Sequence, residues 1–176
     1  MQLYNLHTHS IFSDGKSTPE EVVVEAINQG LKVLGFSDHS PVPFENSFAI
    51  KNDEVNNYVA TIKSLKEKYK DQIEILCSME MDFIPGIVKN FKETKESLGL
   101  DYLIGSVHLV GNDINRGIYK KRSDDFYPST WVFPIMKEMK IPVIISSDAH
   151  HYSELTLCFQ EAEEALRNAG LEVLHK

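Results

Sequence analysis

Residues 3–9 read Leu-Tyr-Asn-Leu-His-Thr-His, a short apolar run that ends in two histidines. Four more apolar runs end in the same way, each followed by side chains that can hold a metal ion. The five runs span residues 3–6, 31–36, 73–79, 102–107 and 141–145, and they are closed by His7 and His9, Asp38 and His39, Glu80, His108, and Asp148 and His150. If the runs are parallel strands of a barrel-like α/β fold, these side chains gather at one rim, where such folds place their active sites.

Helical patterns lie between the apolar runs. Thr18 and Glu21 have capping-box spacing, and Pro19 suits the first helical position. We therefore expect a helix from there to Gln29, with Gly30 as the left-handed residue that ends it. Further helices are expected over residues 55–65, 87–98, 131–139 and 153–169. Strands that alternate with helices indicate a parallel sheet, and ligands at every strand end favour a closed or nearly closed barrel.

The bulk composition is that of one globular domain over residues 1–176, which is short for a full (β/α)8 barrel. The net charge of −8 argues against nucleic-acid binding, because neutralising a phosphate backbone requires a basic face. No apolar stretch approaches the roughly 20 residues of a membrane span, and no export signal precedes the first strand. We therefore expect no membrane partner and a cytoplasmic location. Cys77 and Cys158 are expected to be buried, reduced thiols.

The first ligand candidates come from the two strands nearest the N-terminus. His7 and His9 stand two residues apart at a strand end, so both imidazoles point to the same side. Asp14 is either a third ligand or a turn residue. His39 is a better ligand than its neighbour Asp38, which could instead orient a histidine.

The remaining candidates follow the later strands. Glu80 can bridge two cations or be a solvated acid, and His108 is either a ligand or a core histidine. Asp148 is an oxygen ligand or a base for metal-bound water, and His150 is a ligand. His151 and His175 are expected to lie outside the site as bystanders, and Asp82 could be a loop residue exposed to solvent.

Imidazoles combined with carboxylates, without a cysteine cluster, are typical of a hydrolytic site with two or three metal ions, such as zinc, manganese or iron. Ions about 3.5–4 Å apart activate water for attack at phosphorus. The densest run of positive charge spans residues 115–122, where Arg116 can form bidentate hydrogen bonds to phosphate oxygens. Lys120 is a second substrate-binding candidate, although Lys120, Lys121 and Arg122 could also form a solvated loop. The substrate expected from this pattern is a small-molecule phosphate ester.

The same residues resemble the PHP (polymerase and histidinol phosphatase) family, and within it the histidinol-phosphatase branch. The matching segments are Leu-His-Thr-His-Ser (6–10), Ser-Asp-Gly (13–15), Gly-Phe-Ser-Asp-His-Ser-Pro (35–41), Met-Glu-Met-Asp-Phe (79–83), Gly-Ser-Val-His (105–108), Asn-Arg-Gly-Ile-Tyr-Lys-Lys-Arg (115–122) and Ile-Ser-Ser-Asp-Ala-His (145–150). The resemblance implies a distorted (β/α)7 barrel with up to three divalent metal ions. It also implies hydrolysis of L-histidinol phosphate to L-histidinol and phosphate in histidine biosynthesis.

The resemblance further implies how the ligands divide among the ions. His7, His9, Glu80 and Asp148 would hold one ion, Glu80 and His108 part of a second, and Asp14, His39 and His150 a third. Arg116 would contact the substrate phosphate, and Asp148, Arg116 and His39 are the catalytic candidates.

One interval departs from the family pattern. His108 and Arg116 are separated only by residues 109–115, where the resemblance implies a longer segment with a further metal-ligating histidine. This deletion predicts a shortened, incomplete barrel of about five to six strands. Two alternatives follow from it: a PHP-type phosphoesterase that acts on another phosphate ester, or a degenerate metal-binding domain with weak or no activity.

Overall fold

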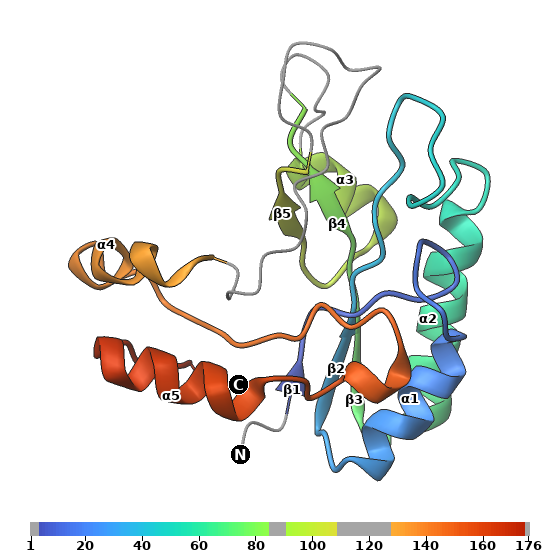
Figure 1. Ribbon diagram of the computed structural model, residues 1–176. Coiled ribbons are helices and arrows are strands. Elements are labelled where there is room, and N and C mark those ends of the chain that lie inside the picture. Colours follow the sequence, from blue (N-terminus) through green and yellow to red (C-terminus); the bar gives the residue numbers. More distant parts are fainter. Residues whose placement is uncertain (1–3, 85–90, 109–127, 175–176) are drawn as a thin grey trace.

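The computed structural model describes residues 4–84, 91–108 and 128–174 (Figure 1). Its centre is a parallel sheet of β1 (Tyr4–Asn5), β2 (Val33–Phe36) and β3 (Glu74–Cys77), in the order β1-β2-β3. A second parallel pair joins β4 (Glu80–Asp82) to β5 (Ile104–Ser106). An isolated bridge between His39 and Glu80 connects the end of β2 to β4. The strands therefore run in one direction, and their carboxyl ends face the same rim.

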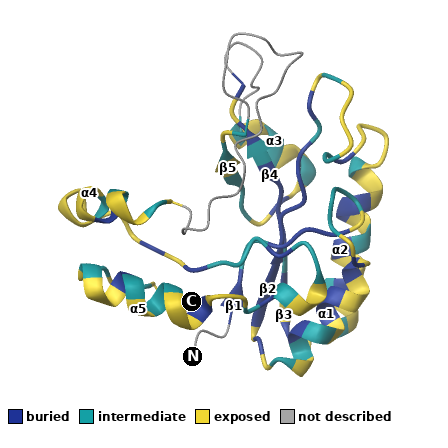
Figure 2. Ribbon diagram, viewed as in Figure 1, coloured by how far each residue is buried: buried dark blue, intermediate teal, exposed yellow. Residues whose placement is uncertain are grey.

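Two helices cover one side of the first sheet. α1 (Pro19–Asn28) and α2 (Val55–Tyr69) contact each other beside β2 and β3 (Figure 1). The expected capping box of α1 is confirmed, and so is Gly30, which follows the helix at a φ of +79°. The core between helices and sheet is apolar, and Figure 2 shows it as the buried face of both layers. Its members include Val22, Val23, Ala26, Leu34, Phe36, Tyr58, Ile62 and Ile75.

Tyr102 joins the segment before β5 to β1. Its hydroxyl donates to the carbonyl of Leu6, and it passes directly over Gly35 in β2. A Cβ atom at position 35 would overlap that hydroxyl, so only glycine leaves room for this contact. α3 (Phe91–Leu98) precedes this segment.

The C-terminal part differs from the expectation. Residues 141–145 were expected to form a strand, but they belong to no strand among the described residues, and Val143 forms an isolated bridge to Val173. Ile141 and Ile144 are 40% and 49% exposed, so the apolar run is not a buried strand. It packs instead through Val143 and Ile145 against a small second core between α4 (Phe133–Glu138) and α5 (Phe159–Ala169). The short 3-10 turn η1 (Thr130–Val132) precedes α4.

The last helix also starts later than expected. Residues 152–154 form the 3-10 turn η2 (Tyr152–Glu154), and Cys158 then adopts a left-handed φ of +57°, which separates η2 from α5. Cys158 is exposed, so the prediction of a buried thiol was wrong there and right for Cys77. Gly170 ends α5 at a φ of +70°, as expected.

The α/β class with parallel strands is thus confirmed, whereas closure of a barrel is not seen among the described residues. The interval with the predicted deletion falls in residues 109–127, outside the described part of the chain. None of the described helices is long and apolar enough to cross a membrane.

Candidate metal centre

The first and last ligand motifs of the chain are held together by backbone pairing. The backbone N–H of His9 donates to the carbonyl of Ala149 (2.8 Å), and that of Ala149 donates to the carbonyl of His7 (3.2 Å). Asp148 takes a left-handed φ of +54°, a conformation that aspartate tolerates better than most residues. This pairing sets Asp148 and His150 beside the two histidines of the first motif, although His7 and Asp148 are 141 positions apart in the chain.

The loop after His9 folds back over the site. A Cβ atom at Gly15 would lie 2.6 Å from the backbone carbon of His9, so this return requires glycine. The loop is tied down by Asp38, whose Oδ1 accepts from the backbone N–H of Ser10 (2.7 Å) and from the hydroxyl of Ser13 (2.7 Å). Asp14 is thereby brought over the imidazole of His9.

Glu80 reaches the site because β4 starts where β2 ends. Its backbone N–H donates to the carbonyl of Ser37 (3.0 Å), and its own carbonyl accepts from the N–H of Ser40 (2.8 Å). His39, between these two serines, therefore stands next to Glu80.

These strand ends form three adjoining groups of side chains. In each group, the atoms that could bind a metal ion lie within 4.8 Å of one another. We number these groups and define each by its members among the described residues. Cluster one is His7, His9, Glu80 and Asp148; cluster two is His9, Asp14, His39 and His150; cluster three is His39, Glu80 and His108.

In cluster one, both histidines face both carboxylates. The Nε2 atom of His7 lies 3.2 Å from Glu80 Oε2 and 3.4 Å from Asp148 Oδ1. The Nε2 atom of His9 lies 3.4 Å and 3.0 Å from the same two oxygens. Two imidazoles and two carboxylates thus converge on one point.

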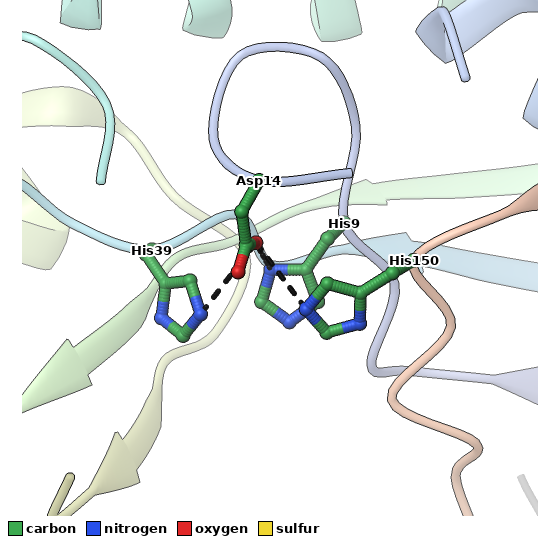
Figure 3. A group of neighbouring side chains, drawn as sticks. All are labelled: His9, Asp14, His39 and His150. Carbon is green, nitrogen blue, oxygen red and sulfur yellow. Dashed lines mark ion pairs between the residues drawn. The ribbon is translucent and has the colours of Figure 1, made fainter. Parts of the chain in front are cut away.

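In cluster two, a single carboxylate lies among three imidazoles, as Figure 3 shows. Asp14 Oδ1 lies 3.7 Å from His9 Nδ1, 3.7 Å from His39 Nε2 and 3.2 Å from His150 Nε2. The rings of His9 and His150 are stacked, with their centroids 4.3 Å apart.

Cluster three shares two of its members with the other clusters. His39 Nδ1 lies 3.2 Å from Glu80 Oε2, and His108 Nε2 lies 3.6 Å from Glu80 Oε1. Glu80 therefore presents one oxygen to cluster one and to His39, and its other oxygen to His108.

The protonation states of His39 and Asp148 suit divalent cations. Burial, followed by repulsion from His9, lowers the pKa of His39 to about 4, so its ring is neutral near pH 7. Burial would raise the pKa of Asp148, but the close approach of the His9 ring and of the other neighbouring histidines holds this pKa well below its ordinary value. Neutral imidazoles and ionised carboxylates are the forms that bind metal.

Buried polar atoms without a hydrogen-bond partner also indicate a metal site. Within the described part of the chain, His9 Nε2, Asp14 Oδ1 and His39 Nδ1 are buried and have no hydrogen-bond partner. Buried polar atoms of this kind normally have partners, and these three all face cluster interiors. The donor set of histidine nitrogens and carboxylate oxygens fits zinc, manganese or iron.

All eight residues predicted as metal ligands lie in these clusters. The grouping differs from that implied by the family resemblance, because His9 also joins Asp14, and His39 also joins Glu80 and His108. Arg116 and Lys120 lie outside the described residues. His151 belongs to none of the three clusters; its ring instead caps η2.

Two acids have roles that the sequence pattern did not reveal. Asp38 contacts serines and positions a loop, and within the described part of the chain it forms no hydrogen bond to a histidine ring. The interpretation of Asp82 as loop solvation is wrong, because its side chain is 4% exposed and contacts His108. A signal for Asp82 was present: it stands two residues after Glu80, and period two places both on the same face of a strand.

The PHP domain family matches residues 5–174, so the chain belongs to that family. Among curated relatives, the probable histidinol-phosphatase of Deinococcus radiodurans is 30% identical over 112 residues, which cover 62% of this chain and 43% of that protein. The probable histidinol-phosphatase of Schizosaccharomyces pombe is 32% identical over 139 residues, which cover 71% and 42%. These relatives place the chain in the histidinol-phosphatase branch, and it spans less than half of their length.

A solved structure shows the same fold. It is the histidinol phosphate phosphatase of Lactococcus lactis subsp. lactis in complex with zinc, L-histidinol and phosphate. The two chains superpose with a TM-score of 0.71 at 18% identity, over 98% of this chain and 95% of the other. At this identity the likeness establishes the fold only.

Proposed function

We propose that this chain is a metal-dependent phosphomonoesterase that hydrolyses L-histidinol phosphate to L-histidinol and phosphate. The observation that carries this proposal is the set of three adjoining clusters, which share His9, His39 and Glu80. Adjoining sites of this kind suit phosphate ester hydrolysis, in which charge on several oxygens must be neutralised at once. The names of the curated relatives, and a similar fold solved with zinc, L-histidinol and phosphate, support the choice of substrate.

Divalent cations bound at these clusters would lower the pKa of water and neutralise the phosphate oxygens. The chain's own residues hold and orient the reactants. The side chain of Asp148 is 43% exposed, the more open of the two carboxylates in cluster one, so water can reach it, and we propose it as the group that accepts the proton of the attacking water. His39 is neutral near pH 7 and lies on the boundary of two clusters. Arg116 and Lys120 are proposed to bind the substrate phosphate, from sequence alone.

We also infer that residues 1–176 form one domain with a shortened PHP barrel of about five to six strands. Two parallel sheets joined by the bridge between His39 and Glu80 support this architecture. The ions are proposed to be zinc, manganese or iron, up to three in number. Participation in histidine biosynthesis and a cytoplasmic location stay predictions from the sequence.

Metal content per chain, measured together with hydrolysis of histidinol phosphate, tests this proposal. We expect at least one tightly bound ion, and loss of both the ion and turnover in His9→Ala and Asp148→Ala. His151→Ala is the matched control, since it removes a neighbouring histidine outside the three clusters. Full metal content in both cluster variants would contradict the assignment.

A second candidate follows from the short interval between His108 and Arg116, where the family resemblance implies a further metal-ligating histidine. It acts on another phosphate ester, or it binds metal with little or no turnover. Nucleotide monophosphates, assayed beside histidinol phosphate with added zinc or manganese, separate these cases. Faster turnover of a nucleotide would favour the other ester, and bound metal without any turnover would favour the degenerate domain.

A further inference from the structure

Asp82 lies opposite the end of β5 and reaches the histidine that follows it. In the pairing of β4 with β5, Asp82 stands in register with Ser106, two residues before His108. Its Oδ1 accepts from the backbone N–H of His108 (3.0 Å) and lies 2.9 Å from Nδ1 of the same residue. One carboxylate oxygen therefore contacts both the backbone and the ring of His108.

This contact decides which ring nitrogen carries the proton. An ionised carboxylate can only accept hydrogen bonds, so the Nδ1 atom that faces it must be the donor. In the neutral ring, a proton on Nδ1 leaves the lone pair on Nε2, which faces Glu80 Oε1 at 3.6 Å.

Cluster three depends on this orientation more than the other clusters do. Among the described residues it has three members, whereas clusters one and two have four each. The side chain of His108 is also 37% exposed, so packing alone does not fix its ring. An acceptor on the far side of the imidazole supplies the missing constraint, as carboxylates commonly do behind metal-binding histidines.

We propose that Asp82 is a positioning residue that holds His108 in the Nδ1-protonated form and so makes Nε2 the metal ligand of cluster three. This inference rests on the proposed function in one respect, namely that cluster three binds an ion. The fixed ring, in contrast, is a property of the metal-free protein.

The first test measures the tautomer of His108 by long-range nitrogen–proton NMR on the metal-free protein with labelled histidine. The wild type is expected to show the proton on Nδ1. Asp82→Ala is expected to shift His108 towards the Nε2-protonated form. Asp82→Asn keeps an acceptor for the backbone N–H of His108, so it protects the fold and is expected to show a smaller shift in the same direction.

The second test is a zinc titration of the same proteins. Loss of a carboxylate behind a metal-binding histidine typically weakens affinity about 10- to 100-fold, and we expect this loss at one site only. The matched controls are Asp101→Ala and Asp101→Asn. Asp101 also accepts a backbone N–H, that of Cys77 (2.8 Å), but its other partner is Lys66 and not a histidine. The Asp101 variants are expected to bind zinc as the wild type does.

An unchanged tautomer in Asp82→Ala would overturn the inference, and so would unchanged zinc affinity at every site. If the tautomer shifts as expected but the wild type binds no zinc, the proposed function fails. The role of Asp82 in fixing the tautomer of His108 is supported in that case.

Discussion

Asp38 serves the site without belonging to any of the three clusters. It is fully buried, and burial raises its pKa, yet it accepts hydrogen bonds from the backbone and hydroxyl of Ser10 and from the hydroxyl of Ser13. These bonds fix the loop that carries Asp14. A buried acid that is fully hydrogen-bonded therefore positions a predicted ligand from a distance.

Asp38→Ala should destabilise the protein and loosen cluster two. The donors of Ser10 and Ser13 would lose their acceptor, which costs about 1–3 kcal/mol for a buried group. Urea denaturation measures the loss, and Asp53→Ala, at an exposed position, is the control. Equal midpoints for the two variants would show that the loop does not depend on Asp38.

His39 predicts a pH dependence for the metal-free protein. Its pKa is about 4 in the folded chain, against an ordinary value of 6.5. Between these values the unfolded chain binds a proton that the folded chain does not, so stability falls as the pH drops from about 6.5 towards about 4. Above 6.5 this contribution is fully present.

His39→Asn should therefore lose less stability than the wild type when the pH is lowered from about 7 to about 5. The free energy of unfolding, measured at both pH values after removal of metal, gives the comparison. His151→Asn should behave like the wild type, because it leaves His39 in place. Parallel pH profiles for the wild type and His39→Asn would contradict the prediction.

α1, which has strong local signals, was predicted well from the sequence, whereas the strand expected over residues 141–145 was not. α1 begins with its capping box and is followed by Gly30, both of which act within a few residues. The apolar run 141–145 has the pattern of the other strands, but a strand requires a neighbour to pair with, and among the described residues this run contributes an isolated bridge at Val143. Periodicity cannot report that neighbour.

Gly35 and Tyr102 form a pair that links β2 to the segment before β5. Gly35→Ala should cost about 1–3 kcal/mol, because its Cβ would overlap the Tyr102 hydroxyl. Tyr102→Phe should cost about 1 kcal/mol through loss of its hydrogen bond to Leu6. The double variant should lose less than the sum, since the overlap is gone. Urea denaturation of the four proteins measures this coupling, and strict additivity would argue against it.

The clusters join segments from the whole length of the chain, from His7 to His150. A ligand that binds only the folded state stabilises it, by about 2.7 kcal/mol at a concentration one hundred times its Kd. Removal of metal with a chelator should therefore lower the Tm of the wild type and have much less effect on His9→Ala. A Tm of the wild type that is insensitive to the chelator would oppose metal binding at these clusters.

The proximity of the ligand candidates could be predicted from the sequence because strand ends in a parallel fold share one rim. What could not be read is how they are shared. Whether His9 contacts Asp14 as well as Glu80 depends on the return of the loop at Gly15 and on the position of β4 beside β2. These are distances between segments far apart in the chain, and no local pattern encodes them.

His9 points Nε2 at Glu80 and Asp148 and Nδ1 at Asp14. A neutral imidazole has one free lone pair, so His9 could bind an ion in cluster one or an ion in cluster two, but not both, unless the ring loses its remaining proton. Adjacent ions would then compete for the same donor. Stepwise loading with unequal affinities follows, and the second ion to enter would bind more weakly at low pH.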